Sequence, residues 1–216
     1  MALFRMMQRN NVNVELLCTA VNGHYDRVSM HGIRRTLLEN QAAAIGLPLE
    51  LILLPEEPSM EEYESILLEK VRSLKKRGID IAGFGDIFLE DLKQYRVNQF
   101  QPTGIECDFP IWKMDTRILF ENFVSEGWKA ITVCVNDHLL GKEFVGRELD
   151  ASFLRDLPSN VDPCGENGEF HTFCYDGPIF KQSVPFTIGD KVFRGYKDPV
   201  DSSKNIGFWF CDLIPK

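Results

Sequence analysis

The chain has 216 residues, enough for one large domain or two small ones. Hydrophobic residues make up 44% of it and charged residues 26%, an ordinary globular composition. The formal net charge of −8 argues against a broad surface for nucleic acids or anionic membranes. There is no apolar run near the roughly 18 residues of a membrane span and no signal-peptide pattern. The six cysteines form no C-x-x-C pair, so we expect free thiols and a cytoplasmic protein.

The first half of the chain alternates short apolar runs with helical patterns. Ser59 precedes an acidic first turn in a capping-box pattern, which predicts a long helix to about residue 77. The other expected elements are helices over 2–7, 33–45 and 89–97 and strands over 14–21, 49–54 and 79–84. Short apolar strands separated by amphipathic helices indicate a parallel sheet that is covered on both faces.

The second half has a different pattern. One helix is expected within 112–127 and a short one over 151–157, with a strand over 130–135 between them. After Pro158 helical periodicity ends, and strands are expected over 170–175, 179–186, 191–196 and 205–213. We place the domain boundary near Gln101-Pro102, which predicts one domain over residues 1–102 and another over 103–216.

The densest group of polar side chains is the run Asp162-Pro163-Cys164-Gly165-Glu166-Asn167-Gly168-Glu169-Phe170-His171-Thr172. In a functional interpretation, Glu166, Glu169 and His171 orient or deprotonate a substrate amine, or hold Mg²⁺. In the structural interpretation, this is a tight loop whose glutamates cap backbone amides and whose histidine satisfies a buried carbonyl. A zinc site on Cys164, Glu169 and His171 is a third interpretation, although the spacing matches no common zinc pattern.

Two more polar loops follow predicted strands, at the carboxyl edge where open α/β sheets bind ligands. In residues 24–32, Arg27, Ser29 and His31 are candidates to contact a phosphate or ribose; alternatively Ser29 or His31 caps the next helix. In Gly83-Phe84-Gly85-Asp86, the aspartate is a candidate to bind a metal–nucleotide or an amine, and its alternative role is the N-cap of the following helix.

These motifs together carry a family resemblance. The segments 25–32, 83–87, 110–112 and 165–172 occur in the same order as in the diphthine–ammonia ligase family, which the whole chain resembles. That family belongs to the adenine nucleotide alpha hydrolase superfamily, also called N-type ATP pyrophosphatases. The resemblance implies an α/β fold, in which a Rossmann-like parallel sheet of adenine nucleotide alpha hydrolase type binds ATP and a smaller α+β C-terminal domain recognises the substrate.

The resemblance also implies an activity. Such a ligase uses ATP and Mg²⁺ to adenylate the carboxylate of diphthine on elongation factor 2, and ammonia then displaces AMP to form the amide. The implied partners are ATP, ammonia and, in a source that has diphthamide, elongation factor 2. We expect neither a membrane partner nor direct nucleic-acid contact, and a homodimer is one expected assembly. No side chain is assigned as a metal ligand.

The implied nucleotide-binding residues are Tyr25, Arg27, Ser29, His31, Gly83, Gly85 and Asp86. The implied catalytic residues are Glu166, Glu169 and His171, and the implied substrate-binding residues are Gly165, Asn167, Gly168 and Thr172.

The chain departs from the family pattern at its beginning. Members of the family start with a strand and a Ser-Gly-Gly-Lys-Asp-Ser loop that grips the phosphates, whereas residues 2–7 here resemble the helix after that loop. We therefore expect that the strand and loop are missing from this chain and that it binds ATP weakly. Two other functions stay open: a related ATP pyrophosphatase that acts on another substrate, and a non-catalytic binding protein.

Overall fold

The computed structural model describes residues 1–28, 31–197 and 205–216. Internal contacts group the chain into an N-terminal unit, Met1–Asp26 with Leu47–Asp115, and a C-terminal unit, Arg27–Gly46 with Thr116–Lys216. Within the described ranges no helix combines the length and the apolar character needed to cross a membrane. The functional division into residues 1–102 and 103–216 stays a prediction.

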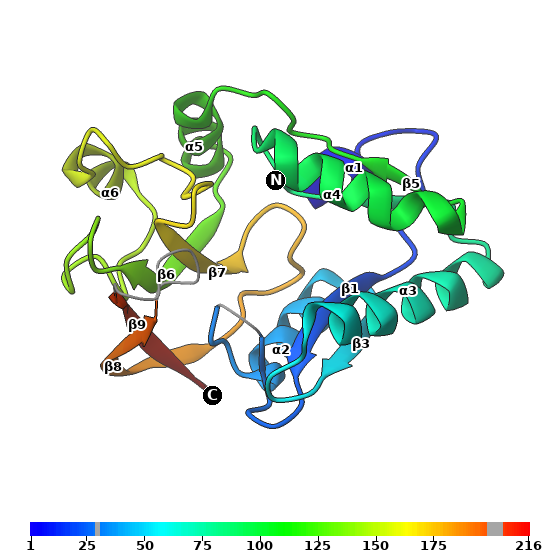
Figure 1. Cartoon of the computed structure of the whole chain (residues 1–216). Helices are drawn as coiled ribbons and strands as arrows, with labels where there is room; N and C mark the ends of the chain where they lie inside the picture. Colours follow the sequence, from blue (N-terminus) through cyan, green and yellow to red (C-terminus); the bar gives the residue numbers. More distant parts are fainter. Residues whose placement is uncertain (29–30, 198–204) are drawn as a thin grey trace. The chain divides into compact units, whose positions relative to one another are not determined.

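Helices and parallel strands alternate in the N-terminal unit (Figure 1). Its elements are α1 (Ala2–Met7), β1 (Leu17–Asn22), β3 (Leu49–Leu54), α3 (Met60–Lys76), β4 (Ile81–Gly83), α4 (Glu90–Phe100), the 3-10 turn η1 (Gln101–Thr103) and β5 (Glu106–Asp108). Strand β1 pairs in parallel with β3, and β4 with β5, so the expected parallel pairing is confirmed.

The fold of this unit is mixed α/β, and its parallel strand pairs belong to two separate sheets. Strands β4 and β5 are three residues long, which limits the ladder they can form. At the end of β4, Met6 of α1 packs on Gly83 so closely that a Cβ atom there would lie 2.0 Å from its sulfur. A continuous Rossmann-like sheet is therefore not shown by the residues that the structure describes.

Local sequence signals explain helix α3, which lies alongside β3 in Figure 1. The Ser59 hydroxyl accepts a hydrogen bond from the Glu62 N–H at 3.2 Å, and the Glu62 carboxylate accepts one from the Ser59 N–H at 3.0 Å. This reciprocal capping box satisfies two N–H groups that would otherwise lack partners at the helix start. Further along, Val71 and Leu74 bury the apolar face of the helix against a small core that includes Phe100.

We expect Ser59→Ala to lower the free energy of unfolding by about 1 kcal/mol, because the substitution removes the side-chain cap of α3. Urea denaturation measures this loss. Ser73→Ala is the matched control, since Ser73 is exposed within the same helix and alanine is the better helix former. Equal effects of the two substitutions would show that the capping box does not stabilise α3.

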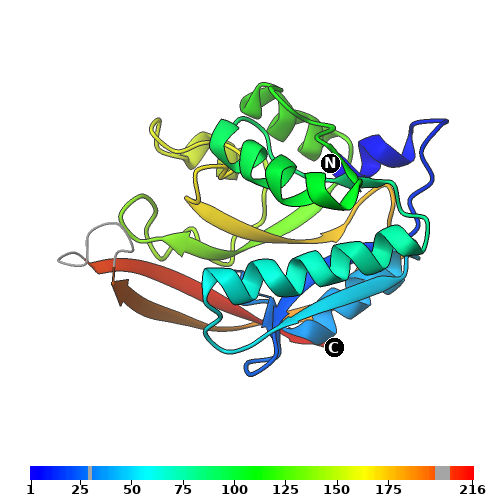
Figure 2. The same cartoon turned by 45° about the vertical axis from the view of Figure 1, so that its right-hand side comes forward.

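The C-terminal unit is built around an antiparallel sheet with the strand order β7-β6-β9-β8. Its elements are β2 (Arg27–Val28), α2 (Arg35–Ile45), α5 (Thr116–Ser125), β6 (Lys129–Asn136), α6 (Ala151–Asp156), β7 (Phe170–Asp176), β8 (Phe186–Lys197) and β9 (Asn205–Pro215). Strands β8 and β9 run side by side as two long strands (Figure 2), with β8 at the end of the sheet.

The core of this unit surrounds β6, whose residues 130–135 are all buried. Phe153 of α6 is fully buried and contacts the rings of Phe120, Phe144 and Phe170 at centroid distances of 5.4–6.1 Å. Helix α2 ends at Gly46 in the left-handed conformation, as the sequence predicts. The same core therefore supports β7, which begins at Phe170 and continues from the polar run 162–169.

The strand predicted over 179–186 is wrong. Residues 179–185 form a turn and an irregular segment, and only Phe186 is in a strand, as the first residue of β8. The Lys181 N–H donates to the Ala44 carbonyl and the Val184 N–H donates to the Tyr175 carbonyl, both at 2.8 Å. Val184 is buried, but Pro178 and Pro185 bracket the segment and supply no N–H for a strand ladder. The apolar pattern here reflects burial without strand pairing.

Candidate functional site

The loop before β7 is organised by the buried carboxylate of Glu169, whose exposed fraction is only 2%. Its Oε1 atom accepts hydrogen bonds from the Asp162 N–H at 2.9 Å and from the Asn167 side-chain amide at 3.0 Å. Its Oε2 atom accepts one from the Asn167 N–H at 2.9 Å. Three donors within a few residues therefore converge on one carboxylate and hold the loop around it.

Asp162 fixes the other end of the same loop. Its Oδ2 atom accepts hydrogen bonds from the N–H groups of Cys164 and Glu166, both at 3.0 Å. Gly165 has a φ of 70°, and a Cβ atom there would lie 2.8 Å from the Phe170 carbonyl oxygen, so only glycine fits without strain. This geometry agrees with the structural interpretation of the loop, in which glutamate side chains cap backbone amides. The catalytic assignment of Glu169 stays a prediction.

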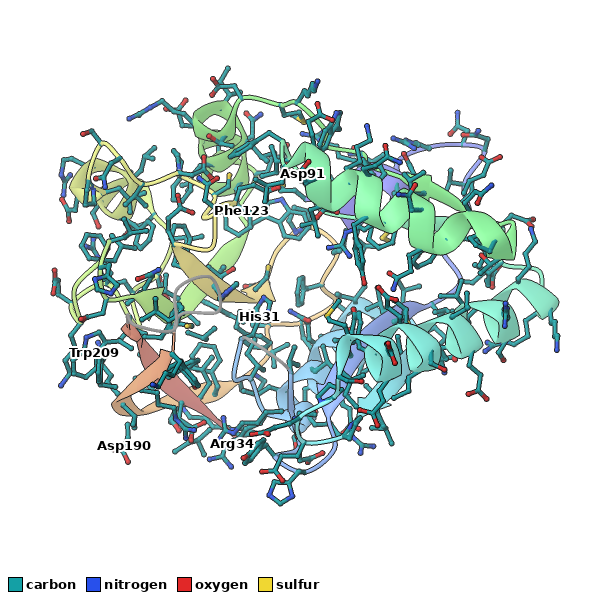
Figure 3. The ribbon with its side chains drawn as sticks, viewed as in Figure 1. His31, Arg34, Asp91, Phe123, Asp190 and Trp209 are labelled. Atoms are coloured by element: carbon teal, nitrogen blue, oxygen red, sulfur yellow. The ribbon has the colours of Figure 1, made fainter. Side chains whose placement is uncertain are left out.

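Histidines from two distant parts of the chain meet in the C-terminal unit. The rings of His31, which precedes α2, and His171, on β7, lie 4.6 Å apart between centroids and are tilted by 47° (His31 is labelled in Figure 3). Burial lowers the pKa of His171 from 6.5 to about 4, and the neighbouring His31 adds to the effect. His171 is therefore uncharged at pH 7, and its ring can still make hydrogen bonds.

A charge cluster that the sequence did not predict lies nearby in the same unit. The Asp212 carboxylate of β9 accepts hydrogen bonds from Arg27 at 2.9 Å and from Arg34 at 2.5 and 3.2 Å. Arg27 also donates to the Gly32 carbonyl at 2.5 Å. Burial opposes ionisation of Asp212, yet the two guanidinium groups outweigh it and lower the pKa of that carboxyl. The cluster ties Arg27 and Arg34 to β9, and no local sequence signal marks Asp212 as its centre.

The remaining candidate nucleotide residues belong to the N-terminal unit, except Ser29, which lies outside the described residues. The Tyr25 hydroxyl bonds the Glu56 carboxylate at 2.6 Å. Asp86 is buried and receives two hydrogen bonds from Arg96, at 2.7 and 3.1 Å. The N-cap position of α4 is Leu89, so the alternative role of Asp86 as helix cap is wrong, because its carboxylate is paired with an arginine inside that helix.

The described residues fit metal binding poorly. They contain no group of three or more histidine, cysteine, aspartate or glutamate side chains placed to hold an ion, so the zinc interpretation of Cys164, Glu169 and His171 gains no support and no residue set for Mg²⁺ emerges. The candidate phosphate ligand Arg27 is bonded to protein oxygens, as described above. Gly85 differs, because no atom lies within 4 Å of where its Cβ would be, which leaves its backbone open to approach.

The residues predicted to bind substrate lie in or beside the 162–169 loop. Asn167 contributes both its backbone and its side-chain amide to Glu169, and Gly168 has a φ of 83°. Thr172 is half-buried on β7, opposite Thr132 of β6. The structure thus brings the 165–172 candidates and His31 together within one compact unit.

Comparison with known proteins relates the chain to one group of enzymes. Residues 115–201 match the family described as the diphthamide synthase C-terminal domain. The chain is similar to the diphthine–ammonia ligase of Danio rerio, with 29% identity over 177 residues that cover 71% of this chain and 66% of that protein. It is also similar to the diphthine–ammonia ligase of Schizosaccharomyces pombe, with 29% identity over 86 residues, 38% of this chain and 14% of that protein. The chain therefore spans slightly less than two thirds of the Danio rerio relative.

Proposed function

Because the chain is related to the diphthine–ammonia ligases, we propose that it takes part in ATP-dependent amide formation of that type. In this reaction a carboxylate of diphthine on elongation factor 2 attacks ATP, pyrophosphate leaves, and ammonia then displaces AMP from the acyl-adenylate. The observation that carries the proposal is the family match over residues 115–201, which contains the Glu169 loop and His171.

We assign the two halves of the reaction to different parts of the chain. Residues 1–102 would bind ATP as an adenine nucleotide alpha hydrolase domain, and residues 103–216 would recognise the substrate. The parallel pair β1–β3 supports the first assignment, as does the open backbone of Gly85 after β4. Mg²⁺ would offset the phosphate charge of bound ATP, although the described residues offer no ligand set for the ion.

The chemistry of the C-terminal unit suits the handling of ammonia. Ammonium cannot attack an acyl-adenylate, because its lone pair carries a proton, and burial disfavours charged forms. Burial likewise keeps the His171 ring neutral. The ring would therefore accept a hydrogen bond from ammonia without becoming protonated. Glu169 would act as a positioning residue that keeps the loop rigid. This leaves Glu166, on the same loop, as the candidate carboxylate for contacting the substrate.

The direct test is incubation of the chain with ammonium, diphthine-bearing elongation factor 2 and Mg-ATP, at Mg-ATP concentrations that compensate for the weak nucleotide binding expected without the phosphate loop. We expect AMP, pyrophosphate and the amide in equal amounts, with Glu166→Gln reducing amide formation about a hundredfold or more at unchanged stability. Release of AMP without the amide would instead favour a related pyrophosphatase that acts on another substrate. Absence of AMP in the presence of every reactant would contradict the ligase assignment and favour a non-catalytic binding protein.

A further inference from the structure

Strand β8 carries several exposed apolar side chains. It is the end strand of the four-stranded sheet, so its outer backbone groups are available for pairing. Ile188 is 52% exposed, and Val192, Phe193 and Tyr196 are each 46% exposed. Long exposed edge strands are templates for pairing with another strand, and Val192 and Phe193 lie near the middle of this one.

We propose that the occupant of this edge is β8 of a second copy of the chain, paired antiparallel about a two-fold axis at Val192. A two-fold axis perpendicular to the sheet keeps every side chain on its own face of the sheet. The residue on the axis lies opposite the same residue of the partner. Each residue that follows it lies opposite the partner residue that precedes it by the same number of positions. With the axis at Val192, Asp190 lies opposite the partner's Arg194, and Lys191 lies opposite the partner's Phe193. Each of these pairs occurs twice.

Charge selects this register over the others. An axis at Arg194 would place that arginine opposite the partner's Arg194 and Lys191 opposite the partner's Lys197, and an axis at Lys191 would place two lysines together. Axes at Phe193 or Gly195 pair no opposite charges. Among these five positions, only the axis at Val192 gives two ion pairs, and it also places two valines in contact at the centre.

The two charged residues are available for such pairing. Asp190 is exposed and lies at the outer side of the β8–β9 pair (Figure 3), and Arg194 is exposed as well. Across the described part of the chain, neither takes part in an ion pair of its own protomer. The positive charges of the lysines and the arginine on β8 disfavour pairing with an unrelated strand. A matching strand must place a carboxylate opposite Arg194.

A bulge limits the length of the pairing. The register with β9 changes between Ile188 and Lys191, where two residues of β8 lie opposite Asp212 alone. Asp190 is the second of these two residues, and the ladder with β9 is regular from Lys191 onward. The proposed paired segment therefore starts at the bulge and runs from Asp190 to Arg194. Five residues a side bury less than the ~800 Å² per partner of a standard stable interface. The dimer is accordingly weak, concentration-dependent and sensitive to salt.

Sedimentation velocity over a concentration series tests this pairing through charge reversal. We expect a reversible monomer–dimer equilibrium in the unmodified chain. Arg194→Asp places two aspartates opposite each other twice and should weaken dimerisation about tenfold or more, and Asp190→Arg should do the same with arginines. The double variant Asp190→Arg/Arg194→Asp restores opposite charges and should recover the dimer.

Arg155→Asp is the matched control, since Arg155 is an exposed arginine on α6 of the same unit, and it should leave the equilibrium unchanged. Circular dichroism of each variant confirms that it remains folded. Three results would overturn the proposal: a monomer at every concentration, a dimer that Arg194→Asp leaves intact, or a double variant that stays as weak as the single ones. None of them bears on the ligase assignment, which the amidation assay tests independently.

Discussion

Glu169→Ala is expected to lower the free energy of unfolding by about 3 kcal/mol. The substitution removes a carboxylate that is 2% exposed and accepts three hydrogen bonds from Asp162 and Asn167. Hydrogen bonds to a charged acceptor are worth about 1.5–3 kcal/mol each, and buried donors without an acceptor add a desolvation cost. Because the loop relaxes as one unit, the total loss of stability is smaller than the sum of the three separate hydrogen-bond contributions. Urea unfolding followed by tryptophan fluorescence measures the difference.

Two further variants make this measurement specific. Glu169→Gln keeps one acceptor oxygen but turns an NH₂ group toward a donor, so we expect a loss between that of alanine and zero. Glu121→Ala removes an exposed glutamate of α5, whose ion pair with Arg117 is a surface pair worth at most about 1 kcal/mol. If Glu169→Ala destabilised the chain no more than Glu121→Ala, the carboxylate would not be what holds the loop.

The loop shows how far local sequence reasoning reaches. Short-range signals predicted the capping box at Ser59 and the end of α2 at Gly46, because each depends on residues within one turn of helix. The same reasoning identified both candidate roles of Glu169 but could not choose between them. That choice depends on which donors face the carboxylate, and this is set by a left-handed turn at Gly165 that the sequence only hints at.

Contacts between residues far apart in the chain could not be predicted from local sequence patterns. His31 and His171 are far apart in the chain, and their contact follows from how the segment before α2 and strand β7 pack in the same unit. Asp212 was overlooked because a single carboxylate in an otherwise apolar strand gives no sign of the two arginines it binds. The error at 179–186 has the opposite cause: Val184 is buried in the core, and burial produced a strand-like pattern where the prolines prevent a ladder.

The burial of His171 beside His31 predicts a loss of stability in acid. His171 has a pKa of about 4 in the folded chain, lowered by burial and then by His31, against 6.5 when unfolded. Between these values the unfolded chain binds a proton that the folded chain does not, so stability falls as the pH decreases from 6.5 to 4. A difference of this size corresponds to about 2–3 kcal/mol at the acid end of the window. Urea unfolding across this pH range measures it.

His171→Phe isolates this contribution, because phenylalanine keeps a ring beside His31 but cannot bind a proton. We expect the variant to lose less stability than the unmodified chain between pH 6.5 and 4, with the two curves parallel above that window. His138→Phe is the matched control, since His138 is exposed in the same unit and should leave the pH dependence unchanged. NMR titration of the His171 ring provides the independent readout. A midpoint near 6.5, or identical pH profiles for His171→Phe and the unmodified chain, would show that folding does not disfavour the protonated ring.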